Sequence, residues 1–210
     1  MVKYESLVLV GTFMVISSVS FILGVLFSNW PYDYYTLWDT TKGQEFFDAA
    51  LEHYKVWGQI PPIINYTFHF VIAIAFVGSF IKIFKPSEDV QYFEYGTLGA
   101  LVIAVCVYVS NVKVGIMSCI AGEWGEVDQN TGLGVIAASE TMIVFILLGV
   151  VLLQGGLFYA FFEDARLKQE FYLKDLKERY EATAEEAAPV EAKSSGAEAK
   201  KTKAKATKKA

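Results

Sequence analysis

Few side chains in this sequence are of types that perform chemistry, and those few are far apart in the chain. His53 and His69 have no cysteine or carboxylate at metal-ligand spacing, and Cys106 and Cys119 do not predict a disulfide framework. The sequence has no G-x-S-x-G elbow, phosphate-binding loop or H-E-x-x-H motif. We therefore expect no enzyme activity, no metal and no cofactor.

Glu140 is the single acidic residue within a long apolar segment, residues 134–162. As a helix this segment reaches about 42 Å, against about 30 Å of bilayer hydrocarbon, so it is expected to cross a membrane. A charge within such a span is costly and calls for a partner. One hypothesis pairs Glu140 with His69 on a neighbouring helix, either to stabilise the bundle or to contact a client helix. The alternative is that Glu140 reaches the lumenal headgroups or a shallow water defect.

The apolar composition predicts a membrane protein with several spans. Hydrophobic types make up 54% of the 210 residues, and the mean hydropathy is +0.36. The first apolar segment is uncharged and no signal-peptide cleavage site follows it, so we interpret it as a retained span. The predicted fold is all-α, a bundle of four transmembrane helices within residues 1–162, with spans at about residues 7–27, 63–84, 97–112 and 135–162. The third span ends at about Val112 or continues past Lys113 toward Ile120.

The connection between the first two predicted spans, residues 28–62, is rich in aromatic residues. Its beginning has the amphipathic rings that favour the headgroup layer, although the aromatics could instead form a pocket for a sugar or lipid. Its second part predicts an interfacial helix with a capping box of Thr41 and Gln44 and an end at Gly58. Four residues would share the apolar face of this helix: Phe47, Ala50, Leu51 and Tyr54.

The second predicted span carries three polar residues whose positions suggest different roles. Lys82 lies near its far end, where we expect the ammonium group to snorkel to water. His69 lies inside the span, where it acts either as a proton relay or as a hydrogen-bond partner of a neighbouring helix. Asn65 begins a glycosylation sequon at the membrane boundary, and we predict that it is unmodified.

Small and polar residues within the spans are candidates for contacts with other membrane helices. Small side chains let helices approach closely, and each polar hydrogen bond between helices contributes roughly 0.6 to 2 kcal/mol. Asn111 also lies in the third span and could contribute such a bond. The candidate contact residues are Ser20, Gly24, Ser28, Ala100, Ala104, Glu140 and Gln154.

The distribution of basic residues predicts the orientation. Fifteen of the 18 Lys and Arg residues fall on one side of a four-span arrangement. By the positive-inside tendency both termini and the loop 85–96 are cytosolic, and the loops 28–62 and 113–134 are lumenal. Residues 163–210 form a charged cytosolic tail, largely disordered beyond Ala182. Its basic end could bind anionic lipid or an acidic coat protein, through Lys200, Lys201, Lys203, Lys205, Lys208 and Lys209.

Four separated blocks of the sequence resemble one known family. They are FILGVLFSNWPYDY (21–34), FKPSEDVQYFEYGTLG (84–99), SNVKVGI (110–116) and WGEVDQNTGLGVIAAS (124–139). These blocks resemble the fungal packaging chaperones of the endoplasmic reticulum that serve amino-acid permeases, the secretory-pathway Shr family. The likeness extends over about residues 7–160, whereas the tail resembles the family only in composition.

The resemblance implies a resident of the endoplasmic reticulum membrane. Such proteins keep newly inserted amino-acid permeases from aggregating and help them enter COPII transport vesicles. The implied partners are permeases, coat components contacted through the tail, and the lipid bilayer; no nucleic acid and no catalytic residue is implied. The alternative is a small transporter or an accessory subunit of a transport complex, against which the sequence offers no inverted repeat and no broken helix pair.

Overall fold

The computed structural model of this chain describes residues 4–85 and 90–206. Every regular element in these ranges is a helix, and four helical segments are long and apolar enough to cross a membrane. They are Ser6–Trp38, Pro62–Ile83, Gln91–Ala121 and Gln129–Thr183. The predicted all-α, four-span class is thereby confirmed. The chain divides into two units, Met1–Phe158 and Tyr159–Ala210.

The first spanning helix is longer than the apolar run alone predicts. Helix α1 comprises Tyr4–Asp33, and a π-helical turn at Tyr34–Trp38 follows it. The predicted span ends at residue 27, before the polar Asn29 and Asp33. Both side chains are buried and hydrogen-bonded, so the helix continues through them without leaving polar groups exposed to an apolar environment.

Helix α2 (Gln44–Gly58) confirms the amphipathic segment and its end at Gly58. Phe47, Ala50 and Tyr54 are buried, and α2 packs against α1 and α5. The predicted capping box is wrong. Thr41 belongs to a short 3-10 turn, Thr40–Lys42, and donates a hydrogen bond to Asp39 instead. Gly43 follows this turn and precedes α2, and its φ of 105° would be strained for other residues.

The next two spans are joined in the order that the sequence predicts. Helix α3 comprises Pro62–Ile83 and α4 comprises Gln91–Val107. A π-helical turn at Tyr108–Val112 connects α4 to α5 (Lys113–Ala121), so the third spanning segment is continuous past the predicted end at residue 112. Helix α6 (Gln129–Ala206) follows Asp128, whose carboxylate accepts hydrogen bonds from the backbone N–H groups of Asn130 and Thr131.

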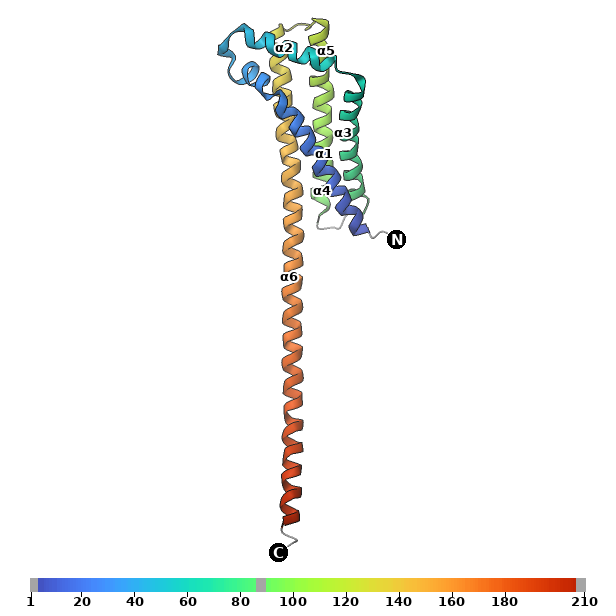
Figure 1. Cartoon of the computed structure of the whole chain (residues 1–210), viewed down its shortest axis with the longest axis vertical. Helices are drawn as coiled ribbons and strands as arrows, with labels where there is room; N and C mark the ends of the chain where they lie inside the picture. The colour runs from blue at the N-terminus through green and yellow to red at the C-terminus, as the bar shows by residue number, and fades with distance from the viewer. Residues whose placement is uncertain (1–3, 86–89, 207–210) are drawn as a thin grey trace. The chain divides into compact units, whose positions relative to one another are not determined.

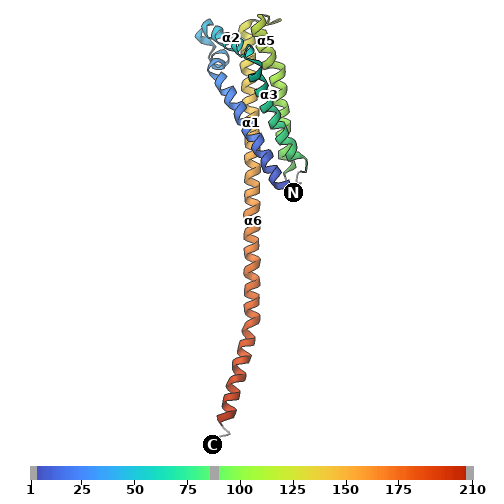
Figure 2. The same ribbon diagram turned by 45° about the vertical axis from the view of Figure 1, so that its right-hand side comes forward.

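Helices α1 and α3 lie side by side (Figures 1 and 2). Their closest approach is at Gly11 and Gly78. A Cβ atom on Gly78 would lie 2.7 Å from the carbonyl oxygen of Gly11, and one on Gly11 would lie 2.8 Å from that of Gly78. Only hydrogen fits at both positions. Small residues therefore do bring two spans together, but through Gly11 and Gly78 rather than through the predicted stripe of Ser20, Gly24 and Ser28.

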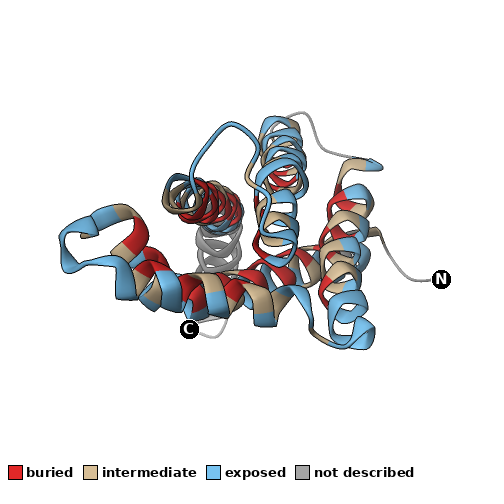
Figure 3. Cartoon of the chain, turned by 90° about the horizontal axis from the view of Figure 1, so that it is seen from above, coloured by how far each residue is buried: buried red, intermediate tan, exposed pale blue. Residues whose placement is uncertain are grey.

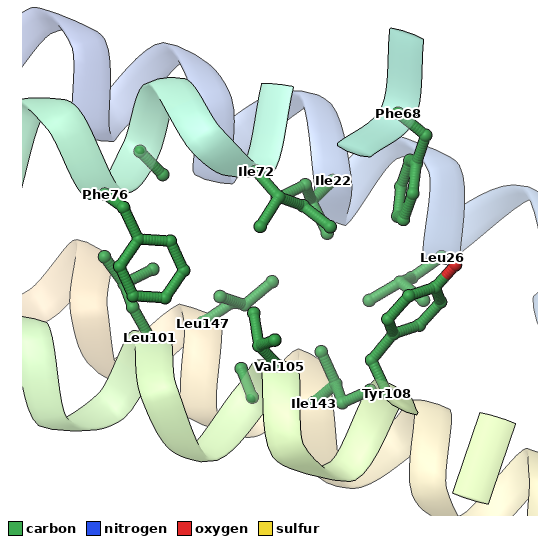
Figure 4. A pocket seen from close by; sticks show the side chains of 12 residues that line it. Ile22, Leu26, Phe68, Ile72, Phe76, Leu101, Val105, Tyr108, Ile143 and Leu147 are labelled. Carbon is green, nitrogen blue, oxygen red and sulfur yellow. The ribbon is translucent and has the colours of Figure 1, made fainter. Parts of the chain in front are cut away.

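The core of the first unit lies between α1, α3, α4 and the first part of α6. In the view along the helices, their buried faces turn toward one another (Figure 3). A small apolar cavity of about 40 Å³ remains at the centre, with Ile22, Ile72, Leu101, Tyr108 and Leu147 among the residues around it (Figure 4). Because its lining is almost entirely apolar, we expect this cavity to be dry.

The second unit, Tyr159–Ala210, is the continuation of α6 as far as Ala206. Its surface carries ion pairs at helical spacing, including Arg179 to Asp175 at 3.0 Å. The helical backbone differs from the disorder that composition predicts beyond Ala182. Ala, Glu and Lys are strong helix formers, which accounts for helix in a segment too polar to form a core.

Candidate functional site

A buried polar network joins α1, α2 and α6. It consists of Asn29, Asp33, His53, Tyr54 and Glu140, and we call it the carboxyl network. The Nδ2 group of Asn29 donates to both carboxylate oxygens of Glu140, at 3.1 and 3.0 Å. The Tyr54 hydroxyl donates to Oδ1 of Asp33. Both carboxyl groups are buried, with Asp33 4% and Glu140 3% exposed.

Helical spacing explains how the chain assembles the carboxyl network. Asn29 and Asp33 are four residues apart on α1, so both face α6. His53 and Tyr54 are adjacent on α2; Nε2 of His53 lies 3.0 Å from Oδ1 of Asn29. Because that oxygen can only accept, Nε2 carries the proton.

Burial also shifts the ionisation of the two α2 residues. It lowers the pKa of His53 below its ordinary value, which favours the neutral imidazole. It raises the pKa of Tyr54, and the nearby carboxylates of Glu140 and Asp33 raise it further, so the phenol remains a donor. The ring of His53 stacks on Tyr32 with centroids 3.9 Å apart. These groups can hold a proton and exchange hydrogen bonds, but they do not include a nucleophile paired with a base.

Both expectations for Glu140 are wrong. Its hydrogen-bond partner is Asn29 rather than His69, and with 3% of its surface exposed it does not reach the headgroups. His69 instead bonds within its own helix, through Nδ1 to the backbone oxygen of Asn65 at 2.8 Å. The sequence predicts a loop from residue 28, whereas Asn29 lies on α1 and faces Glu140.

A second buried network lies where α3, α4 and α6 meet. Nζ of Lys82 is 3.0 Å from Oε1 of Glu94 and also donates to Oε1 of Gln154. Nε2 of Gln154 donates to Oγ1 of Thr97 at 2.7 Å. All four residues are at most 2% exposed. The expectation that Lys82 snorkels to water is therefore wrong, because Glu94 on the adjoining helix supplies a closer partner.

Two apolar grooves border the first unit. The α1–α6 groove encloses about 270 Å³ and includes Trp30, Val144 and Phe145, with Asp33 and Glu140 in its wall. The α4–α6 groove is about 520 Å³, lies between Phe93 and Leu152, and contains no charged residue. The first groove thus differs from the second in giving access to buried carboxyl groups.

The predicted helix-contact residues fall into three groups in the structure. Ser20, Gly24 and Ser28 are exposed, and a Cβ on Gly24 would have no neighbour within 4 Å. Ala100 lines the α4–α6 groove, and Ala104 is buried in the core. Glu140 and Gln154 belong to the two polar networks. Asn111 donates to Oγ of Ser139 at 3.1 Å.

The predicted coat or lipid contacts lie in the tail. Lys208 and Lys209 are outside the described residues. For Lys200, Lys201, Lys203 and Lys205 the structure describes the helical backbone only. Their role stays a prediction.

Sequence reasoning missed several members of the networks: Asn29, Asp33, Tyr54 as a donor, Glu94 and Thr97. One available signal was the spacing of four residues between Asn29 and Asp33, which places two polar side chains on one helix face. A second was the position of Glu94 in the first turn of a helix that follows Lys82 by a short connection. Polar groups so placed at the ends of adjacent antiparallel spans can meet.

Fold and site together define a helical membrane protein with several spans, held together inside by polar networks and apolar on its outer faces. The profile of a protein family described as ER membrane protein SH3, the SHR3 chaperones, matches residues 6–195. The chain therefore belongs to this family of endoplasmic reticulum membrane chaperones. It is similar to the secretory component protein psh3 of Schizosaccharomyces pombe, with 26% identity over 165 residues, 79% of this chain and 76% of that protein. No solved structure matches the chain.

Proposed function

We propose that this protein shields newly inserted amino-acid permeases from aggregation in the endoplasmic reticulum and assists their packaging into COPII vesicles. The observation that carries the proposal is its membership of a family of membrane chaperones over nearly the whole chain. In this proposal the chaperone binds its clients and does not modify them chemically, because its buried polar groups are occupied by hydrogen bonds to one another.

The outer face of α1 is suited to contact with a client helix. Ser20, Gly24 and Ser28 form a stripe of small residues that no other part of the described chain covers. In lipid, where the hydrophobic effect does not drive helices together, association depends on close packing and polar contacts. A client helix can approach this stripe closely and leave it again when the permease folds, because each such contact contributes little energy.

We further propose that both termini face the cytosol. The basic residues of the tail support this orientation, and a cytosolic tail could contact coat components or anionic lipid. In sealed microsomes, a cysteine introduced at Thr40 should be protected from an impermeant maleimide, and one at Lys174 should react. Reaction of both positions from outside would contradict the arrangement.

Deletion of the gene in the host tests the function. Amino-acid permeases should remain in the endoplasmic reticulum, whereas unrelated plasma-membrane proteins should reach the cell surface. A general secretion block would contradict the proposal. Solute flux in proteoliposomes that contain the purified chain alone would support the transporter alternative instead.

The α1 stripe is tested by comparing matched substitutions on exposed positions. Gly24→Leu places a large side chain on the stripe and should reduce permease recovery with the chaperone. Gly99→Leu, at an exposed glycine of α4 that likewise has no neighbour within 4 Å of an added Cβ, should not. Equal recovery with both variants would show that the stripe does not contact clients.

A further inference from the structure

The α1–α6 groove brings a lipid-facing apolar surface to two buried carboxyl groups. Asp33 and Glu140 are 4% and 3% exposed, yet both lie in the wall of this groove of about 270 Å³. The rest of its lining is almost entirely apolar and includes Phe27, Trp30 and Phe145, which are 68%, 42% and 67% exposed. The groove is therefore open at its rim and acidic at its base.

The two carboxyl groups at its base have no counterion among the side chains that the structure describes. No Lys or Arg in residues 4–85 or 90–183 forms an ion pair with Asp33 or Glu140. Glu140 accepts hydrogen bonds from Asn29 through both of its oxygens, and Asp33 accepts one from the Tyr54 hydroxyl. His53 contacts Asn29 and not a carboxyl group, and burial lowers its pKa, which favours the neutral imidazole. An external ammonium or guanidinium group would supply the counterion that these carboxyl groups lack.

We propose that the α1–α6 groove binds a transmembrane helix of a client that carries a lysine or arginine in its lumenal half. This inference rests on the proposed function and identifies the chemistry of the client segment. A basic side chain in a span that has not yet found its own partners is costly in hydrocarbon, so such helices need a temporary counterion. The carboxyl pair supplies one, and the exposed aromatic rings add favourable contacts with a cation.

The shape of the groove favours a helix over a lipid headgroup. Its α6 wall extends over nine residues from Glu140 to Leu148, or about 12 Å along the helix axis. A client helix lying along this wall contacts two turns of α6 while its basic side chain reaches the carboxyl groups. A headgroup would remain at the interface and leave most of this apolar wall unused.

Photocrosslinking in microsomes with the full chain tests the inference. A photoreactive residue replaces Phe145 at the rim, and the probe is a membrane protein whose leucine-rich span has either lysine or leucine at one lumenal-half position. The lysine probe should crosslink about 3-fold to 30-fold more, the ratio that corresponds to one helix–helix hydrogen bond of about 0.6 to 2 kcal/mol. The same residue at Leu152, exposed on the α4–α6 groove, should show no preference.

The double variant Asp33→Asn/Glu140→Gln tests whether the carboxyl groups are responsible. Its amide oxygens can still accept from Tyr54 and Asn29, but neither group can be ionised, so the preference for lysine should disappear while the leucine probe still crosslinks. Should this variant not accumulate, Leu148→Trp fills the groove without touching the network and should also remove the preference. Leu152→Trp is its matched control on α6 and should retain it.

Three results would overturn the inference: equal crosslinking of the two probes at position 145, a lysine preference that survives Asp33→Asn/Glu140→Gln, or adducts at position 145 that contain lipid alone. None of these would contradict the proposed function if permeases still depend on the protein to leave the endoplasmic reticulum. Conversely, normal permease export in the deletion strain would remove the proposed function whatever the probes show.

Discussion

Removing the ammonium group of Lys82 should destabilise the membrane unit strongly. The Nζ of Lys82 and Oε1 of Glu94 are 3.0 Å apart, with side-chain exposures of 0% and 3%. Coulomb's law gives about 5.5 kcal/mol at this distance for an effective dielectric constant of about 20. Breaking a buried pair by removing one partner costs about 3 to 5 kcal/mol, because the remaining charge stays buried. We expect Lys82→Met to lower the free energy of unfolding by about 3 to 5 kcal/mol.

The double variant Lys82→Met/Glu94→Leu separates the ion pair from general packing. Replacing both charges by apolar groups removes the uncompensated carboxylate, and buried pairs replaced in this way often lose little stability. One defect remains, since Oε1 of Gln154 loses the ammonium donor, which costs about 1 kcal/mol. We therefore expect the double variant to be destabilised by no more than about 2 kcal/mol, so the coupling between the two positions is at least about 1 kcal/mol.

The measurement is unfolding of the purified full chain in mixed micelles of increasing SDS content, followed by the fluorescence of its 4 tryptophans. Arg179→Met provides the control, because its pair with Asp175 is exposed on the second unit and should contribute less than about 1 kcal/mol. The reasoning is refuted if the double variant is as unstable as Lys82→Met. It is also refuted if Lys82→Met unfolds at the same SDS content as the unmodified chain.

Further predictions address packing, pH and modification. Gly78→Ala forces a Cβ to within 2.7 Å of the Gly11 oxygen and should destabilise the protein by about 1 to 3 kcal/mol, whereas Gly24→Ala, with no neighbour within 4 Å, should leave stability unchanged or slightly higher in the same SDS assay. Burial lowers the pKa of His53, so the unfolded state binds its proton first; stability should be full above about pH 6.5, decline as the pH falls below it, and lose this slope in His53→Gln. A pH profile identical for the two proteins would contradict that assignment. Asn65 lies in the first turn of α3 at the edge of a span, so endoglycosidase treatment should not change the protein's mobility on gels, and a mobility shift would show that the sequon is modified.

Sequence alone predicted the features that depend on local composition and periodicity. The lengths of the apolar runs determined four spans, because a helix needs enough apolar residues to match the hydrocarbon thickness. The spacing of Phe47, Ala50 and Tyr54 determined the buried face of α2, because residues at helical periodicity share a side wherever the helix packs. The helix-contact stripe, the orientation and the tail contacts stay predictions.

Only the tertiary structure decided which polar groups meet. Glu140 bonds to Asn29, which is 111 positions away, and Lys82 meets Gln154, 72 positions away. A single sequence shows how costly each buried polar group is, but its partner depends on the rotation and depth of separate helices in the bundle. The same geometry exposed Ser20, Gly24 and Ser28 while placing Gly11 against Gly78 of α3, although Gly11 and the exposed stripe are all small residues on α1. Residue type set the possible contacts, and helix packing selected among them, because packing determines which side of each helix faces its neighbours.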